Sequence, residues 1–360
     1  MLEKGNVWYV RHYETYFDRV YVAYLFGGRH EPVRNGATTL ISLSTGNMLR
    51  DLSLAPWRLY RLARKVHATS YLTADLVYSW WTCLLLRLWL GAKIVLMPVS
   101  MPESLYRSTG RSLSKLLPIR LERKFIAWSF KMADRVLTFT AFGAFVSWLK
   151  ESYSKKLMVV DVIPESLPSS GFLEKCRCVK LDDPDDKFTL VSVSGLRSEK
   201  QVDHLVRMMS VLVGMVPNVV LKLVGDGPER PRLEQLANDL HVSDRIDFLG
   251  YVKNEELPSI LSECDAFVSV VTGTALREAA LCGLPIVAYD RDWIHGFLHD
   301  GENALLVPPD DYAEMARQVL RLIEDRDLRR RLSVNVKDFA WAVFSPDKLR
   351  DSLRRTFATY

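Results

Sequence analysis

Short apolar runs alternate with amphipathic segments along most of the chain, and this order predicts parallel sheets built from βαβ units. In the first half, the runs that predict strands are residues 19–25, 38–42, 74–78, 93–97 and 135–140. The segments that predict helices are residues 59–66, 82–90, 113–133 and 143–151. The first half therefore has the pattern of an α/β domain.

The alternation restarts after residues 163–187, a stretch rich in Pro, Ser and Asp that indicates a boundary between domains. Beyond it, the runs that predict strands are residues 189–193, 219–224, 246–248, 266–270 and 286–289. The segments that predict helices are residues 201–212, 230–240, 254–263, 274–281, 313–325 and 346–357.

These patterns predict an α/β fold of two Rossmann-like domains. The expected divisions are an N-terminal domain at 1–165, a linker at 166–186, a second domain at 187–345, and a last helix at 346–360 that crosses back to the first domain.

The composition, with 48% hydrophobic and 25% charged residues, is that of a globular protein and excludes a disordered chain or a coiled coil. The five cysteines form no disulfide or zinc framework, because Cys176 and Cys178 are too close in sequence to clip a metal. The longest apolar stretch, residues 84–99, is interrupted by Arg87, Gly91 and Lys93 and is too short to span a bilayer. We therefore expect a cytoplasmic protein that is soluble or peripheral on the inner face of a membrane.

Positive charge is concentrated in the first half. Residues 1–170 carry 23 Lys and Arg against 12 Asp and Glu, whereas the remainder carries 25 against 31. One explanation is solvated helix faces, and the other is a surface for an anionic membrane or a phosphorylated acceptor. Since no nucleic-acid recognition motif accompanies this charge, nucleic acid is not an expected partner.

Two loops that follow predicted strands carry candidate binding chemistry. In the first, Gly195 allows close backbone approach, and Arg197 and Lys200 are placed to neutralise a diphosphate. An Arg and a Lys are also common in surface loops, so this loop alone is not decisive. The second loop, residues 223–229, ends a strand with two glycines, and it fits a tight turn at least as well as a ligand contact.

A third candidate is the helix that begins after Gly273. Free backbone N–H groups and the positive end of the helix dipole form an anion site at such a terminus. Glu278 lies about one turn further on, where a carboxylate accepts hydrogen bonds from both ribose hydroxyls. The competing interpretation is a surface carboxylate that stabilises the start of the helix.

Taken together, the order and spacing of these features resemble the C-terminal domain of the family-4 retaining glycosyltransferases, over residues 189–310. The residues that carry the resemblance are 223–230, 247–252, 278–288, 300–303 and 305–309. It implies the GT-B architecture, in which two Rossmann-like domains face a cleft, and a nucleotide-sugar donor. It also implies that the diphosphate lies at the loop from Ser194 and at Gly273, the ribose at Glu278 and the base near Tyr251 and Val252.

By the same resemblance, the donor-binding residues are Gly195, Val252, Thr272, Gly273, Thr274, Ala275 and Glu278. Lys200 and Arg197 are the candidate catalytic residues, because they would stabilise the leaving diphosphate. No cofactor and no metal are expected. Of two acidic patterns, the one at Asp183 and Asp185 is ascribed to solvation, and basic groups are expected to replace a cation at Asp290 and Asp292.

The chain departs from the family at positions that concern the chemistry. Val270 stands where the family has the first carboxylate of its Glu-x7-Glu motif, and Val99 follows a strand where a histidine is expected. Residues 194–196 lack the usual arginine of the phosphate loop. Before Arg19 the chain offers little room for the first strand of the family, which is therefore expected to be short, missing or replaced by residues 6–10.

The leading hypothesis is a retaining, metal-independent transferase that moves a sugar from a nucleotide diphosphate to an acceptor glycan or a lipid-linked sugar. The alternative is a non-catalytic homologue that binds nucleotide sugar or regulates a partner enzyme. A sugar-nucleotide 2-epimerase is a third reading, for which no acid–base residues are placed.

Residues 105–131 mix basic and bulky apolar side chains in a way that suits the interface of an anionic bilayer. The alternative is that the apolar side chains pack on the sheet of the first domain. Pro118 predicts two shorter helices in place of one.

Overall fold

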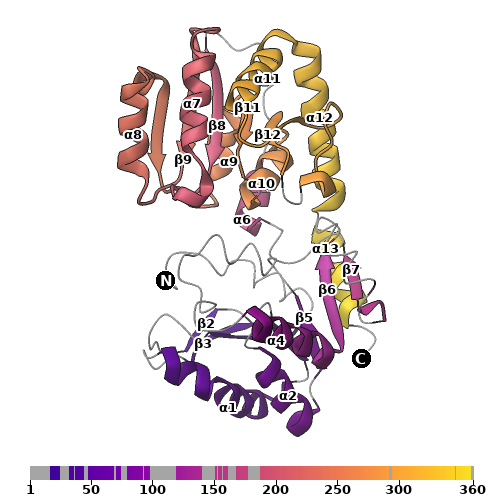
Figure 1. The fold of residues 1–360 in the computed structure, drawn as a ribbon. Coiled ribbons are helices and arrows are strands. Elements are labelled where there is room, and N and C mark those ends of the chain that lie inside the picture. Colours follow the sequence, from indigo (N-terminus) through magenta and orange to yellow (C-terminus); the bar gives the residue numbers. More distant parts are fainter. Residues whose placement is uncertain are drawn as a thin grey trace. The chain divides into compact units, whose positions relative to one another are not determined.

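The chain forms two units in the computed structural model (Figure 1). Unit 1 comprises Met1–Glu165 and Pro346–Tyr360, and unit 2 comprises Ser166–Ser345. The structure describes residues 17–24, 32–35, 37–43, 48–68, 70–73, 79–91, 93–97, 119–139, 151, 153–155, 157–160, 168–176, 187–271, 273–291, 294–344 and 346–357. The predictions for residues 6–10, 74–78, 98–100 and 143–150 lie outside this range.

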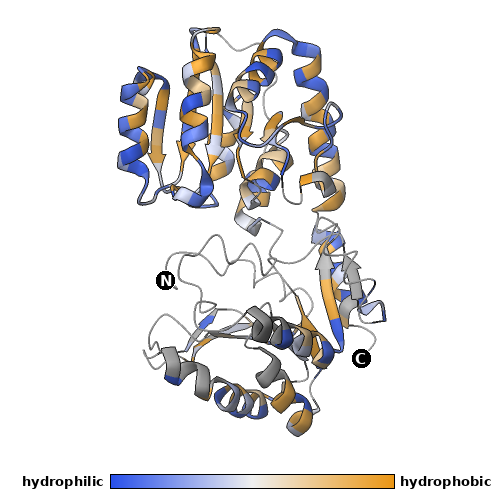
Figure 2. Ribbon diagram, viewed as in Figure 1, coloured by the Kyte–Doolittle hydropathy of each residue, from blue (hydrophilic) through white to orange (hydrophobic). Residues whose placement is uncertain are grey.

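Unit 2 is built on a six-stranded parallel sheet with the strand order β10-β9-β8-β11-β12-β13. Its strands are β8 (Phe188–Val193), β9 (Val219–Val224), β10 (Ile246–Gly250), β11 (Ala266–Ser269), β12 (Ile286–Tyr289) and β13 (Leu305–Val307). The central strands are buried on both faces, which explains why they are continuous apolar runs in the sequence (Figure 2).

Helices form two groups around this sheet. They are α6 (Ser170–Lys175), α7 (Asp203–Leu212), α8 (Arg230–Asp239), α9 (Leu257–Ser262), α10 (Thr274–Cys282), α11 (Tyr312–Glu324) and α12 (Arg326–Val343). Helix α7 packs against α8 and α11, whereas α10 packs against α9 and α12. Right-handed crossovers place α7 and α10 on opposite faces, because their connections leave the central strands in opposite directions.

Unit 1 contains two described sheets. The first is parallel, in the order β4 (Ser70–Thr73), β5 (Lys93–Leu96), β6 (Arg135–Phe139) and β7 (Leu157–Val160). The second places β3 (Thr38–Ser42) between β1 (Val20–Tyr24) and β2 (Val33–Asn35), parallel to β1 and antiparallel to β2. The described helices are α1 (Met48–Val66), α2 (Ser79–Leu90), α4 (Ile119–Met132) and α13 (Pro346–Phe357).

Helix α13 packs in unit 1, although it follows unit 2 in the sequence. Leu349 and Leu353 are buried on its inner side. The ring of Phe357 meets that of Phe17 edge-on at 4.9 Å, and the Arg135 guanidinium donates to the Arg355 carbonyl at 2.7 Å. Contacts with two separate segments of the first half, at Phe17 and Arg135, therefore hold this helix.

The structure corrects several of the expected elements. The predicted helix at 59–66 is the second half of the longer α1, and β2, β4, β7 and α12 were not expected. The expected linker contains the short helix α6, whose Ser169 side chain accepts a hydrogen bond from the Phe172 N–H and whose Phe172 is buried. This part of the supposed linker is therefore ordered protein of unit 2.

Residues 105–131 are described only from Ile119 onward, in α4. In this helix Lys124 is exposed, the Trp128 side chain is 44% exposed and Phe130 is buried. The membrane interpretation of the segment stays a prediction. None of the helices within the described ranges is long and apolar enough to cross a bilayer.

Two cysteine side chains are in contact at the C-terminal end of α10. The Sγ atom of Cys176, just after α6, lies 3.2 Å from the Sγ atom of Cys282, at the end of α10. The hydrogen bond between the two thiols lowers the pKa of Cys176. The pair joins the short N-terminal helix of unit 2 to the helix that carries Glu278.

Candidate functional site

The carboxyl edge of the unit 2 sheet collects the loops that the sequence singled out. Strands β8 and β11 are direct neighbours, with Leu190 opposite Ala266, and the chain runs outward from them in opposite directions. In open α/β sheets such a reversal of strand order leaves a crevice at the carboxyl ends, where ligands bind. The loop after β8 and the start of α10 directly follow these two strands, so this is the edge at which a ligand is expected.

The glycines at this edge fall into two kinds. A Cβ atom on Gly225 would lie 1.9 Å from the Ser194 carbonyl oxygen, and one on Gly227 would lie 2.2 Å from the Leu196 carbonyl oxygen. Beside Gly195 and Gly273, by contrast, a Cβ atom would meet nothing within 4 Å. The first two glycines are thus required by the protein itself, whereas the other two face open space.

Close packing fixes the loop after β8. The Leu196 N–H donates to the Asp226 carbonyl at 3.1 Å, and the Leu196 carbonyl accepts from the Glu229 N–H at 3.0 Å. The Leu196 side chain is buried. The loop after β9 is therefore a support for the loop that carries Arg197 and Lys200, in line with the turn interpretation of residues 223–229.

The two basic residues of the supported loop differ in their surroundings. The Arg197 guanidinium is 67% exposed and lies 4.0 Å from the Glu199 carboxylate. Lys200 is half-buried at the end of a single 3-10 turn, Ser198–Lys200. Among the described residues its ammonium has no ion-pair partner. Lys200 is therefore better placed than Arg197 to pair with an anionic ligand, because no described carboxylate competes for its ammonium group.

The start of α10 follows β11 at the same edge of the sheet. Gly273 is its N-cap in extended conformation, and no side chain caps the helix. Thr274 is exposed and Ala275 half-buried, so small side chains surround the first-turn N–H groups, which have no partner inside a helix. Thr272 lies outside the described residues. This terminus has the features of an anion site.

Glu278 is not the surface carboxylate of the competing interpretation, because it is only 4% exposed. Its Oε1 atom accepts a hydrogen bond of 2.6 Å from the Asn254 amide, whose own oxygen accepts from the Ser169 hydroxyl at 2.7 Å. Burial raises the pKa of Glu278 to about 7, against the opposing effects of Asn254 and Arg277. A carboxylate held in this way has a fixed direction and an unusually basic character.

Sequence reasoning missed a second polar cluster, which adjoins Lys200. The Arg291 guanidinium donates to the Gln201 side chain and, at 3.2 Å, to Asp310, which also accepts from the Gln201 amide at 3.2 Å. His204 Nδ1 and the Tyr289 hydroxyl are 3.0 Å apart, and burial raises the pKa of Tyr289. The cluster links Gln201, the residue after Lys200, to the end of β12 and to the turn after β13.

The remaining predicted positions are described only in part. Val270, which stands at the place of a family carboxylate, is buried in the core at the end of β11. Tyr251 is 67% exposed and Val252 half-buried after β10, so the tyrosine presents an open ring face at the expected base position. The described residues contain no group of three or more His, Cys, Asp or Glu side chains that would hold a metal ion.

Comparison with known proteins agrees with this geometry. Residues 179–339 match the family described as glycosyl transferases group 1. Alpha-D-kanosaminyltransferase of Streptomyces kanamyceticus is 29% identical over 173 residues, which cover 47% of this chain and 45% of that protein. The lipopolysaccharide core biosynthesis glycosyltransferase LpsE of Rhizobium meliloti is 30% identical over 184 residues, covering 50% and 52%. The chain thus spans about half the length of these relatives.

Solved structures match over nearly the whole chain. Anabaena HepE, determined in complex with UDP, has a TM-score of 0.73 and 17% identity and covers 98% of this chain and 96% of its own. The sucrose-phosphate synthase of Thermosynechococcus elongatus has a TM-score of 0.72 and 18% identity, covering 94% and 89%. The fold is therefore GT-B.

Proposed function

We propose that this chain, whose C-terminal unit is a glycosyl transferases group 1 domain, transfers a glycosyl group from a nucleoside-diphosphate sugar to an acceptor hydroxyl. The observation that carries the proposal is the convergence of three features on one sheet edge. The supported loop with Lys200 follows β8, and the uncapped start of α10 and the buried Glu278 follow its neighbour β11. Relatives named as glycosyltransferases support it.

In this proposal the positive groups act on the leaving diphosphate. Breaking the bond between the sugar and the diphosphate leaves negative charge on the β-phosphate, and preorganised donors that meet this charge lower the barrier. Lys200 and the backbone N–H groups after Gly273 would supply these donors, with Arg197 at the exposed rim. Gly195 and Gly273 leave the space in which the phosphates approach the backbone.

Glu278 would hold the ribose. Its carboxylate accepts hydrogen bonds, and Asn254 and Ser169 fix its orientation from behind. The exposed Tyr251 ring and Val252 offer an apolar surface for the base. Since the ribose hydroxyls donate to the ionised carboxylate, nucleotide binding would favour deprotonation of Glu278.

Retention of anomeric configuration belongs to the proposal and follows from the resemblance of residues 189–310 to retaining enzymes. The acceptor, a glycan or a lipid-linked sugar, would bind in unit 1. The name of one relative, LpsE, points to such an acceptor, since it concerns lipopolysaccharide core biosynthesis. Proton NMR of the product anomer tests retention directly.

A panel of nucleotide sugars, assayed for binding by calorimetry and for transfer and hydrolysis, tests the function.

Lys200→Ala should weaken nucleoside-diphosphate binding more than nucleoside binding, because only the diphosphate carries the charge that the ammonium group pairs with. Lys187→Ala, an exposed lysine of the same unit, is the matched control. Equal losses for both ligands would show that Lys200 is structural.

The same panel separates the enzyme from a non-catalytic homologue. The buried Val270 is the observation that favours the latter, since it places no carboxylate at the end of β11. Donor binding without transfer to any acceptor and without hydrolysis would support the regulatory role. Turnover of a single donor would eliminate it.

A further inference from the structure

Lys200 stands immediately before a residue with an unusual backbone conformation. Gln201 has a φ of 48° and a ψ of 36°, in the left-handed region, and its N–H donates to the Ser198 carbonyl at 3.2 Å. This conformation costs free energy in any residue other than glycine, so it persists only where the surroundings hold it. Because Gln201 joins the 3-10 turn to the start of α7, its conformation determines the direction in which the Lys200 side chain leaves the backbone.

Two side chains from distant parts of unit 2 hold Gln201. The Arg291 guanidinium donates to the side-chain oxygen of Gln201, and the Gln201 amide donates to Asp310 at 3.2 Å. Arg291 also donates to Asp310 at 3.2 Å, so each member of this Arg291–Gln201–Asp310 network contacts the other two. Gln201 lies just before α7 and Asp310 just before α11, and these two helices pack together (Figure 1). The network therefore forms where two packed helices begin.

Arg291 is itself held by the end of β12. Its guanidinium lies 5.4 Å from the centre of the Tyr289 ring, and that ring is buried. The Tyr289 hydroxyl is in turn 3.0 Å from His204 Nδ1 on α7. The planar fork of a guanidinium allows one side chain to donate to both Gln201 and Asp310, and a lysine ammonium lacks this geometry.

The charges of Arg291 and Lys200 have different surroundings. The Arg291 guanidinium is paired with the Asp310 carboxylate, whereas no described carboxylate pairs with Lys200. Arg291 therefore acts on the turn and not as a second unpaired cation for the diphosphate. A lysine side chain is long and flexible, and a donor that is fixed in advance stabilises developing charge better than a mobile one.

We propose that Arg291 is a positioning residue, which directs Lys200 towards the leaving diphosphate through its contacts with Gln201 and Asp310. This inference rests on the proposed function, because it concerns the same donor site. It adds a residue from another loop, since Arg291 lies 90 positions after Gln201 in the sequence.

Calorimetry of the full chain with UDP, GDP and ADP, each compared with its nucleoside, tests the positioning role. Arg291→Lys keeps the charge but lacks the fork. It should weaken diphosphate binding by roughly threefold to tenfold, less than the loss of a hydrogen bond to a charged group, and leave nucleoside binding unchanged. Arg245→Lys is the matched control and should bind like the wild type. Arg245 is also paired with an aspartate, Asp244 at 3.1 Å, but it precedes β10 at the opposite edge of the sheet.

Gln201→Gly is a second test that does not depend on the stability of the Arg291 variant. Glycine adopts the left-handed conformation without strain, so the turn should still form and the circular-dichroism melting curve should change little. The variant removes the side chain that Arg291 and Asp310 contact. It should therefore weaken diphosphate binding to the same extent as Arg291→Lys.

A double variant separates positioning from a direct contact or a general structural role. In the Lys200→Ala background, Arg291→Lys should cause no further loss of diphosphate affinity, because no ammonium is left to position. Additive losses would overturn the proposal, since Arg291 would then bind the diphosphate itself or support the whole unit. Wild-type affinity in Arg291→Lys and Gln201→Gly, beside a loss in Lys200→Ala, would overturn it and leave the proposed function intact.

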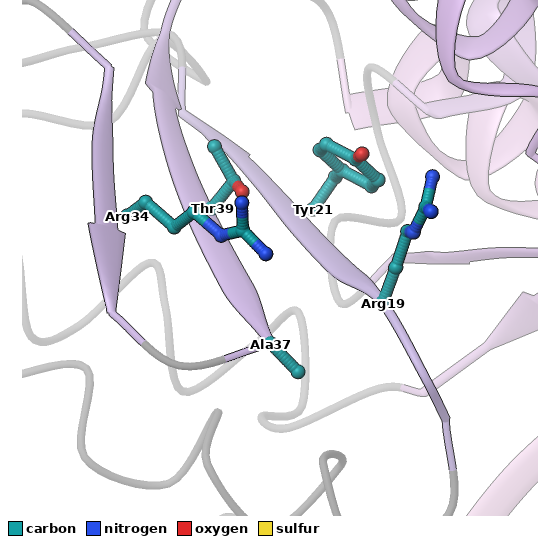
Figure 3. Close-up of a pocket in the computed structure, with 5 residues that line it drawn as sticks. All are labelled: Arg19, Tyr21, Arg34, Ala37 and Thr39. Carbon is teal, nitrogen blue, oxygen red and sulfur yellow. The ribbon is translucent and has the colours of Figure 1, made fainter.

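Binding of the diphosphate outside unit 2 is recognised because these variants would not change it. Unit 1 also has arginines at its surface, where Arg19 and Arg34 line a hollow on the β1–β3–β2 sheet (Figure 3). A diphosphate retained there would bind the wild type, Arg291→Lys and Lys200→Ala alike. That result, or absence of wild-type binding to all the diphosphates, would overturn the positioning role together with the assignment of the diphosphate to Lys200.

Discussion

Replacing Glu278 by glutamine isolates the effect of one buried charge. The carboxylate is 4% exposed, and its Oε1 atom accepts a 2.6 Å hydrogen bond from Asn254. Glutamine keeps the size of the side chain and an oxygen that accepts this bond, while it removes the ionisable group. Alanine would instead leave the Asn254 amide without its acceptor and create a void, so its effect on stability would be a sum of several terms.

The magnitude follows from the pKa of Glu278, which burial raises from 4.5 to about 7. Each pKa unit corresponds to about 1.4 kcal/mol, so the shift amounts to about 3 kcal/mol. The folded state binds the proton more tightly than the unfolded chain, and stability therefore falls as pH rises. The contribution of the protonated group is fully present below pH 4.5 and is lost as pH rises through about 7.

The assay compares thermal unfolding of the wild type, Glu278→Gln and Glu302→Gln, an exposed glutamate of the same unit, between pH 4.5 and 8. At pH 4.5 the wild type and Glu278→Gln should melt close together. At pH 8 the glutamine variant should be more stable by up to about 3 kcal/mol, which raises the melting temperature by roughly 6–12 °C. Parallel curves for the wild type and Glu278→Gln would refute the reasoning, whatever the Glu302→Gln control shows.

Three further predictions concern the same unit. Gly227→Ala should lower the melting temperature, since its Cβ atom would lie 2.2 Å from the Leu196 carbonyl oxygen, whereas Gly195→Ala should fold normally and weaken diphosphate binding in calorimetry. Equal melting temperatures would contradict the distinction. Hydrogen peroxide should join Cys176 to Cys282, whose sulfurs are 3.2 Å apart, as an intramolecular disulfide seen in a non-reducing peptide map; the reduced peptides alone would speak against it. Transfer or donor binding should survive EDTA, because Lys200 and the start of α10 replace a cation, and restoration only by magnesium or manganese would overturn this.

The architecture of unit 2 was largely predictable from the sequence. Parallel strands covered on both faces are apolar along their length, so residues 286–289 are distinct from the amphipathic helices beside them. The short helix α6 was not predictable, because Pro, Ser and Gly around it favour a linker. Its order comes from Ser169, which caps the helix, and from the burial of Phe172.

From the sequence, only those features of the candidate site that lie within one continuous segment could be predicted. Glu278 was a candidate from its own segment, but its hydrogen-bond partner Asn254 and the Ser169 that donates to Asn254 lie 24 and 109 positions before it in the sequence. Gln201 and Asp310 are 109 positions apart, and each comes just before one of two helices that pack together, α7 and α11. Neither residue belongs to a local pattern, so no reading of a single loop would have paired them.

The assignment of α13 to unit 1 determines how the protein can be divided. Unit 2 is one continuous segment, Ser166–Ser345, whose six strands and their hydrogen bonds are all contained within it. Unit 1 is discontinuous, since Leu349, Leu353 and Phe357 follow unit 2 in the sequence. An expression fragment that ends at residue 345 removes a packed helix from the opposite half of the molecule. A fragment of residues 1–165 exposes the surface that this helix covers, unless residues 346–360 are fused to it.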